Sequence, residues 1–69
     1  MSGEAIPKRG IERAREDAPE WATHAIVDSD GDHRYADSGP AAQTLAEERR
    51  EVLAFLTGEE RVVEVMSLD

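Results

Sequence analysis

The sequence contains no cysteine, and this absence excludes several architectures that are common among very small proteins. Disulfide frameworks, Cys-ligated zinc sites and thiol nucleophiles all require that residue. The 69 residues therefore have to fold around one small core without covalent or zinc cross-links. A chain of this length buries only ~60% of the surface that its unfolded form exposes. A single small domain is the expected result.

Long apolar segments are also missing. No apolar run approaches the ~20 residues that a helix needs to cross a bilayer. The first residues lack the apolar stretch that is typical of a secretion signal. We therefore expect a cytoplasmic protein that has no membrane partner.

Positive charge is scarce, with 8 Lys and Arg residues against 16 Asp and Glu residues and a net charge of -8. A surface this acidic lacks the positive footprint that direct nucleic-acid binding requires. Lys8 is the one lysine, and the composition resembles that of proteins adapted to high salt. A GC-rich genome would also favour Arg over Lys. Because salt screens the repulsion between carboxylates, an experiment at low and high salt can separate these two explanations.

Large apolar residues are few and unevenly distributed. Leu, Ile, Val and Phe supply 13 of the 69 residues, and 11 of these lie between Ile26 and the C-terminus. The sequence therefore predicts a flexible, disordered tail over residues 1–20 and a folded domain over residues 21–69. Residues 11–17 could form a turn or two of helix, but such a short helix needs a surface on which to dock.

A β-hairpin is predicted over residues 21–37. The segment 21–28 contains β-preferring side chains, and Asp30-Gly31 is typical of a two-residue type I′ turn. That turn places Ile26 opposite Tyr35. Alternation then puts the following side chains on one face of the hairpin: His24, Ile26, Asp28, His33, Tyr35 and Asp37.

A helix is predicted over residues 40–57, with Ser38 or Gly39 as its N-cap, Pro40 in its first turn and Gly58 at its end. Its apolar positions recur at spacings of three and four. The predicted inner face comprises Ala42, Leu45, Ala46, Arg49, Val52, Leu53 and Leu56, with Phe55 at its margin. A last strand is predicted over residues 61–66.

The order β-β-α-β predicts an α+β fold, in which one helix packs on one face of a three-stranded sheet. A right-handed crossover through the helix makes the third strand parallel to the second. Two positions are open for the third strand, because it could lie beside the first strand or beside the second.

Apolar side chains on both strand faces predict self-association, because one helix covers only one face. We expect a homodimer through the other face. The predicted contacts are Ile26, Tyr35, Val62 and Met66. The helix could instead take that face, since Val27, Val63 and Val65 also qualify. Two further alternatives are that the tail folds back through Ile6 and Ile11, or that two sheets join edge to edge.

Three acidic residues, Asp28, Asp30 and Asp32, initially resemble a calcium-binding loop. An EF-hand loop that began at Asp28 would require Gly at His33 and Glu at Gly39, so two defining positions do not match. We interpret the segment as a polar hairpin turn. A weak cation site is the alternative.

The two histidines do not form a convincing metal or acid-base site. The predicted register pairs His24 with Asp37 and His33 with Asp28, which is ordinary cross-strand stabilisation. No serine lies in a nucleophile motif, and no phosphate-binding loop is present. We expect a non-enzymatic protein that needs no cofactor and no metal.

The sequence therefore predicts a small acidic module that binds proteins. The expected partner is a second copy of the chain, and an unidentified protein is a further candidate partner. An acidic inhibitor that mimics DNA and occupies a nucleic-acid-binding protein is the alternative. Added salt should strengthen an apolar dimer of acidic chains and weaken the binding of a DNA mimic to a basic partner. One basic cluster lies in the tail, at Lys8, Arg9, Arg13 and Arg15. We interpret it as part of a solvated mixture of charges, and contact with an acidic partner is the alternative.

Overall fold

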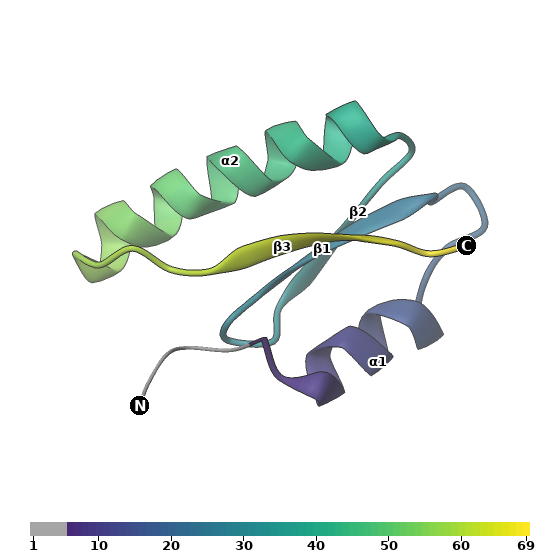
Figure 1. Cartoon of the computed structure of the whole chain (residues 1–69), viewed down its shortest axis with the longest axis horizontal. Coiled ribbons are helices and arrows are strands. Elements are labelled where there is room, and N and C mark those ends of the chain that lie inside the picture. Colours follow the sequence, from purple (N-terminus) through teal and green to yellow (C-terminus); the bar gives the residue numbers. More distant parts are fainter. Residues whose placement is uncertain (1–5) are drawn as a thin grey trace.

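The computed structural model describes residues 6–69 and shows an open three-stranded sheet between two helices (Figure 1). The α+β class is confirmed, whereas the single predicted helix becomes two. The elements in chain order are α1 (Lys8–Glu16), β1 (His24–Asp28), β2 (His33–Ala36), α2 (Gly39–Thr57) and β3 (Val63–Ser67). The predicted tail covers residues 1–20, of which 1–5 lie outside the described residues.

The sheet has the strand order β2-β1-β3, and both neighbouring pairs are antiparallel. The third strand therefore lies beside the first, which was one of the two predicted positions. Strand β1 occupies the centre and is buried along most of its length. Strands β2 and β3 each have one edge that no strand of residues 6–69 covers.

The hairpin register differs from the prediction by one residue. The loop has three residues, Ser29 to Gly31, and is closed by a 2.9 Å hydrogen bond from the Gly31 amide to the Asp28 carbonyl. Gly31 has φ 90°, the left-handed conformation that such a loop requires at its last position. Tyr35 consequently lies opposite Ala25 instead of Ile26. The one-residue shift moves every β2 side chain to the other face of the sheet.

Helix α2 has the caps that the sequence predicts. The Ser38 hydroxyl accepts a 3.2 Å hydrogen bond from the Ala41 amide, and Pro40 lies in the first turn. Gly58 ends the helix with φ 76°. The core beneath α2 consists of Ile26, Ala36, Ala42, Ala46, Leu53 and Val63.

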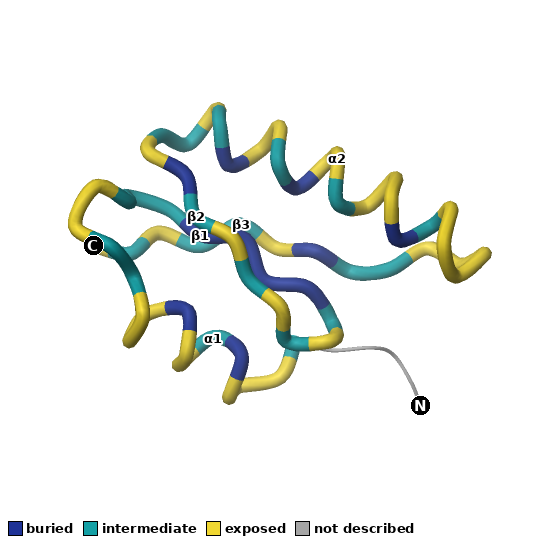
Figure 2. The backbone as a smooth tube through the Cα atoms, turned by 180° about the vertical axis from the view of Figure 1, so that it is seen from behind, coloured by how far each residue is buried: buried dark blue, intermediate teal, exposed yellow. Residues whose placement is uncertain are grey.

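Helix α1 covers the second face of the sheet (Figure 2). It belongs to the segment that the sequence analysis assigned to a flexible tail. The surface on which it docks is formed by Ala25 and Val27 of β1, and Ala14 of α1 is fully buried against them. The partly buried residues around this second cluster are Ile6, Tyr35, Met66 and Leu68. The structure therefore follows the alternative in which the N-terminal segment folds back over the sheet.

Candidate functional site

The hairpin turn is organised by the buried carboxylate of Asp28, whose exposed fraction is 2%. Its Oδ1 atom accepts hydrogen bonds from the amides of Asp30 at 2.9 Å and Asp32 at 3.1 Å. Its Oδ2 atom accepts from Nε of Arg49 on α2 at 3.3 Å. The buried charge is thus paired and hydrogen-bonded, as burial requires. The interpretation of this segment as a polar turn is confirmed.

The other two turn carboxylates are also paired with arginines. Asp30 accepts from Arg61 at 2.6 Å, and Asp32 lies 3.6 Å from Arg49. Among residues 6–69, no group of three or more His, Asp or Glu side chains is arranged to hold a metal ion. The acidic triplet therefore joins the turn to α2 and to the segment that precedes β3.

The two histidines lie on opposite faces of the sheet, and the predicted His-carboxylate pairs are wrong. In the observed register His24 faces Ala36 and His33 faces Val27. The His24 Nδ1 atom lies 2.7 Å from the Thr23 hydroxyl. The His33 ring makes an edge-on contact with Tyr35 at a centroid distance of 5.2 Å. Both rings have local structural contacts and do not converge on one site.

The four residues predicted to form a dimer interface do not share a face. Ile26 is buried beneath α2. Tyr35 and Met66 pack beneath α1, and the Tyr35 hydroxyl donates a 2.7 Å hydrogen bond to the Ala14 carbonyl. Val62 is half-buried, and its carbonyl accepts from the Ser29 amide. Tyr35 lies on the other face than predicted because the hairpin register differs by one residue. Helix α1 covers the sheet face that was predicted to bind a second copy.

A cavity of about 380 Å³ lies between α2 and the hairpin end of the sheet, and its lining includes Ile26 and Asp28 of β1 and Val63 of β3. Arg13, Arg34 and Arg49 from three different elements also line it. A second hollow of about 220 Å³ shares Arg34 and Arg49 with this cavity and extends to Leu45 and Val52 on α2. We call this continuous surface the β2 groove. The β2 groove is not predictable from the sequence, because only the fold brings its arginines together.

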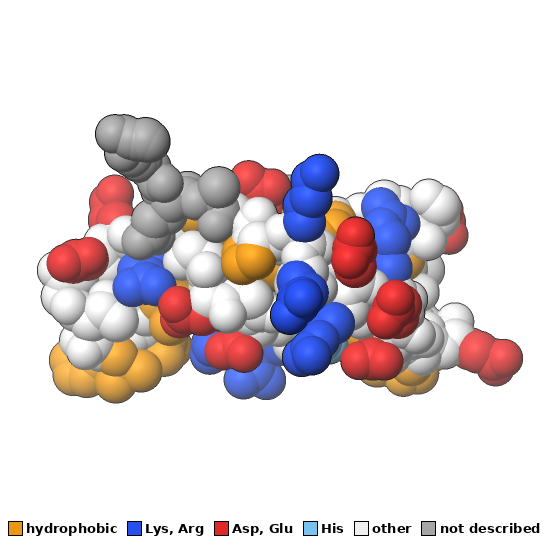
Figure 3. Space-filling model, turned by 90° about the horizontal axis from the view of Figure 1, so that it is seen from below, with side chains coloured by type: hydrophobic (Ala, Val, Ile, Leu, Met, Phe, Trp, Pro, Cys, Tyr) orange, Lys and Arg blue, Asp and Glu red, His pale blue; other side chains and the backbone are white. Residues whose placement is uncertain are grey.

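A second surface feature is the C-terminal end of α2, where Val52, Phe55 and Leu56 are 46%, 87% and 70% exposed. We call these three residues the α2 patch. Figure 3 shows hydrophobic side chains gathered at the left end of the molecule, the end at which α2 terminates in Figure 1. The prediction that Val52 and Leu56 face the core is wrong. Val52 lies beside the buried Leu53, at the margin of the inner face, whereas Leu56 lies in the last turn of a helix that is longer than the sheet. Its 19 residues span roughly 28 Å, whereas a five-residue strand spans roughly 17 Å.

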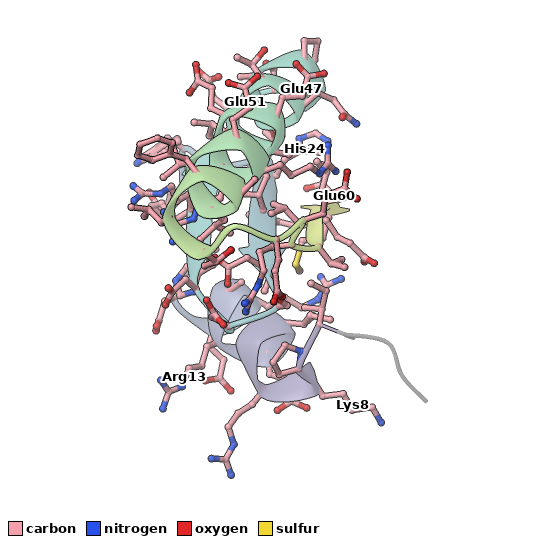
Figure 4. The ribbon with its side chains drawn as sticks, turned by 90° about the vertical axis from the view of Figure 1, so that its left-hand side faces the viewer. Lys8, Arg13, His24, Glu47, Glu51 and Glu60 are labelled. Carbon is pink, nitrogen blue, oxygen red and sulfur yellow. The ribbon has the colours of Figure 1, made fainter. Side chains whose placement is uncertain are left out.

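Charge is distributed unevenly between the two helical layers. Helix α1 carries four basic and two acidic residues, although the chain as a whole has a net charge of -8. Figure 4 shows Lys8 and Arg13 extending from α1 at the bottom of the view, to the right and to the left of that helix. Glu47 and Glu51 lie on α2 at the top of the view. The basic residues of the molecule therefore lie mainly at α1 and around the hairpin end of the β2 groove.

Comparison with protein family models, curated proteins and solved structures found no match for this chain. Within residues 6–69, no helix combines the length and apolar character that crossing a bilayer requires. The β2 groove and the α2 patch are the two surface features of the described residues that could bind a partner.

Proposed function

We propose that this protein is a small non-enzymatic interaction module that self-associates through the α2 patch. The observation that carries the proposal is the exposure of Phe55 and Leu56 on one helix face, beside the half-exposed Val52. Both faces of the sheet are already covered by helices. We therefore propose that the self-association contact, which the sequence predicts on a sheet face, lies on the α2 patch.

The composition of the core supports self-association. The nine buried apolar residues include five alanines, and the larger ones are only Ile26, Val27, Leu53 and Val63. The chain thus leaves its one phenylalanine in solvent while it builds the interior from small side chains. Burial of a Phe or Leu side chain contributes about 1.5–3 kcal/mol. A small domain without cross-links gains substantially from covering such residues.

A second copy is the partner that best fits the α2 patch. An isologous contact places the same apolar residues of both copies against each other, so no complementary charge is needed at its centre. The main opposing force is repulsion between two chains that each carry a net charge of -8. Salt screens that repulsion and favours apolar contacts. Association should therefore strengthen as salt rises.

The test is the molar mass of the full chain by light scattering after size exclusion, at low and at multi-molar salt. We expect a dimer whose population grows with salt and with protein concentration. The Phe55→Glu variant should be a monomer with an unchanged circular dichroism spectrum. Gln43→Glu is the matched control, because it adds the same charge at another exposed position of α2 and should leave the dimer intact.

Two results would overturn the proposal. A folded wild-type monomer at every salt and protein concentration would show that the α2 patch does not bind a second copy. Equal loss of the dimer in the Phe55 and Gln43 variants would show that added charge, and not the patch, controls association. A folded monomer that binds a basic protein at low salt and releases it as salt rises would instead favour a DNA mimic.

A further inference from the structure

The outer edge of β2 exposes backbone hydrogen-bonding groups. The Asp28 amide donates to the Asp32 carbonyl, so in an antiparallel ladder Asp32 and Arg34 direct their backbone groups toward β1. The alternating residues His33 and Tyr35 direct their N–H and C=O groups to the opposite side. Within residues 6–69, β1 is the one strand that pairs with β2, so this edge is available to another strand.

The outer edge of β3 is more protected. The Ser29 amide donates to the Val62 carbonyl, which places the outward-directed groups of β3 at Val63, Val65 and Ser67. The guanidinium group of Arg50 on α2 donates a 2.7 Å hydrogen bond to the outward carbonyl of Val63. A side chain from the covering helix therefore blocks the start of that edge.

The side chains around the β2 edge form a site with both charge and apolar surface. A row along α2 faces the groove at spacings of three and four: Leu45, Glu48, Arg49 and Val52. Arg49 is engaged by Asp28 and Asp32. Arg13 and Arg34 have no acidic partner within residues 6–69. Over the whole β2 groove three arginines meet the carboxylates of Asp28, Asp32 and Glu48, so the positive charge available to a ligand is that of Arg13 and Arg34 and not a net charge of the groove.

We propose that the β2 groove binds an extended, carboxylate-bearing segment of a partner protein, which adds as a fourth strand beside β2. The backbone of that segment pairs with the outward groups of His33 and Tyr35. A carboxylate on the α2 side of the segment binds Arg34, because a guanidinium group recognises a carboxylate through two parallel hydrogen bonds. An apolar side chain two residues away on the same side packs against Leu45 and Val52.

The open edge fits a different protein better than a second copy of β2. Antiparallel pairing of two β2 edges around Arg34 would place the Arg34 side chains of both copies directly opposite each other on the same face. Like charges in that position destabilise a strand pair. A carboxylate in that position has the opposite effect. The site shares Val52 with the α2 patch but does not include Phe55 or Leu56, so binding at Arg34 and the β2 edge can be tested in a Phe55→Glu monomer.

The probe is a blocked peptide, Gly-Val-Thr-Glu-Thr-Val-Gly, in which each Val lies two residues from Glu and on the same face, added to the isotope-labelled full chain and followed by amide NMR. We expect the amides of His33 and Tyr35 to shift and to gain protection from hydrogen exchange. Arg34→Glu should weaken binding by at least about tenfold, because it removes the charge-assisted hydrogen bonds to the carboxylate and places two carboxylates together. The same variant should bind the peptide in which Lys replaces Glu.

Arg15→Glu is the matched control, since it makes the same charge change on α1 outside the β2 groove. It should retain binding, and Phe55→Glu should bind as well as the wild type even if it becomes monomeric. Equal weakening by Arg34→Glu and Arg15→Glu would overturn the proposal, as would shifts that map to β3. Concentration-dependent shifts of His33 and Tyr35 without peptide would show that a second copy occupies the edge, which also overturns it. The proposal is also overturned if neither peptide shifts the amides of His33 and Tyr35 at millimolar concentration.

Discussion

Gly10 of α1 lies directly against Gly31 of the hairpin loop, so closely that a Cβ atom on Gly10 would lie 2.9 Å from the Gly31 Cα atom. The same Cβ atom would lie 3.2 Å from the Gly31 carbonyl oxygen. Helix α1 therefore docks through backbone contact between two residues that lack side chains. This contact explains how a nine-residue helix, marginal by itself, obtains the surface that it needs.

Gly10→Ala tests this contact. Alanine improves helix propensity by about 1 kcal/mol in a helix interior. The new Cβ atom, however, meets backbone that cannot rotate away, and overpacking of this kind costs about 1–3 kcal/mol. We expect a net loss of about 1 kcal/mol in the free energy of unfolding, measured by urea denaturation. Glu12→Ala, at an exposed position of α1, is the control and should cause no loss. A Gly10 variant more stable than the wild type would contradict the docking contact.

The ion pair between Asp28 and Arg49 predicts strong coupling between the turn and α2. Removal of one partner leaves the other partly or fully buried without its counter-charge. We expect Asp28→Asn and Arg49→Gln each to lower the free energy of unfolding by about 3 kcal/mol. The double variant should cost much less than the sum of the two. Asp32→Asn removes an exposed carboxylate at the longer distance of 3.6 Å and should cost at most about 0.5 kcal/mol. Additive effects of Asp28 and Arg49 would show that the pair is not coupled.

Tyr35 predicts a loss of stability at alkaline pH. Burial, and then the negative charge of Asp17, raise the pKa of the Tyr35 hydroxyl above its ordinary value of 10.0. The folded protein therefore retains this proton at a pH at which the unfolded chain loses it. The stabilisation is fully present below pH 10.0 and disappears as pH rises through the folded-state pKa. The free energy of unfolding should fall over that range.

The measurement is an ultraviolet titration of tyrosinate, which reports Tyr35 alone because the chain contains one tyrosine. Denaturation curves at several pH values provide the stability. Tyr35→Phe should lose the tyrosine-dependent part of the pH effect and about 1 kcal/mol at neutral pH, because the hydrogen bond to Ala14 is absent. Asp17→Asn should lower the raised pKa of Tyr35. A wild-type titration at the pKa of a free tyrosine would contradict the prediction.

Local signals in the sequence were sufficient to predict α2. Ser38, Pro40 and Gly58 each act within one turn of the helix end, so no tertiary information was needed. The hairpin was found as an element, but its register depended on a loop of three residues instead of two. That single residue decided the face on which Tyr35 lies. The acidic turn was also predictable, whereas its pairing with Arg49 depended on a helix 21 positions away.

Three features could not be predicted from the sequence, because they depend on small residues or on tertiary distances. Helix α1 docks through Gly10 and Ala14, which give little hydrophobic signal in a sequence. Phe55 and Leu56 are exposed because α2 extends beyond the strands. The helical periodicity of the sequence does not reveal the length of the helix relative to the sheet. The β2 groove combines arginines from α1, β2 and α2 that are far apart in the chain.

Gly58 provides a test of backbone conformation alone. It ends α2 with φ 76°, and a Cβ atom at this position would meet no heavy atom of residues 6–69 within 4 Å apart from those of Gly58 and its two chain neighbours. Gly58→Ala should therefore lower the free energy of unfolding by about 1–2 kcal/mol, the cost of a left-handed conformation for a residue with a side chain. Gly58→Asn should cost less, because asparagine adopts this conformation more readily. Urea denaturation measures both. Equal costs for alanine and asparagine would show that the loss arises from something other than the left-handed backbone, and the cap would then have to be assigned to another contact.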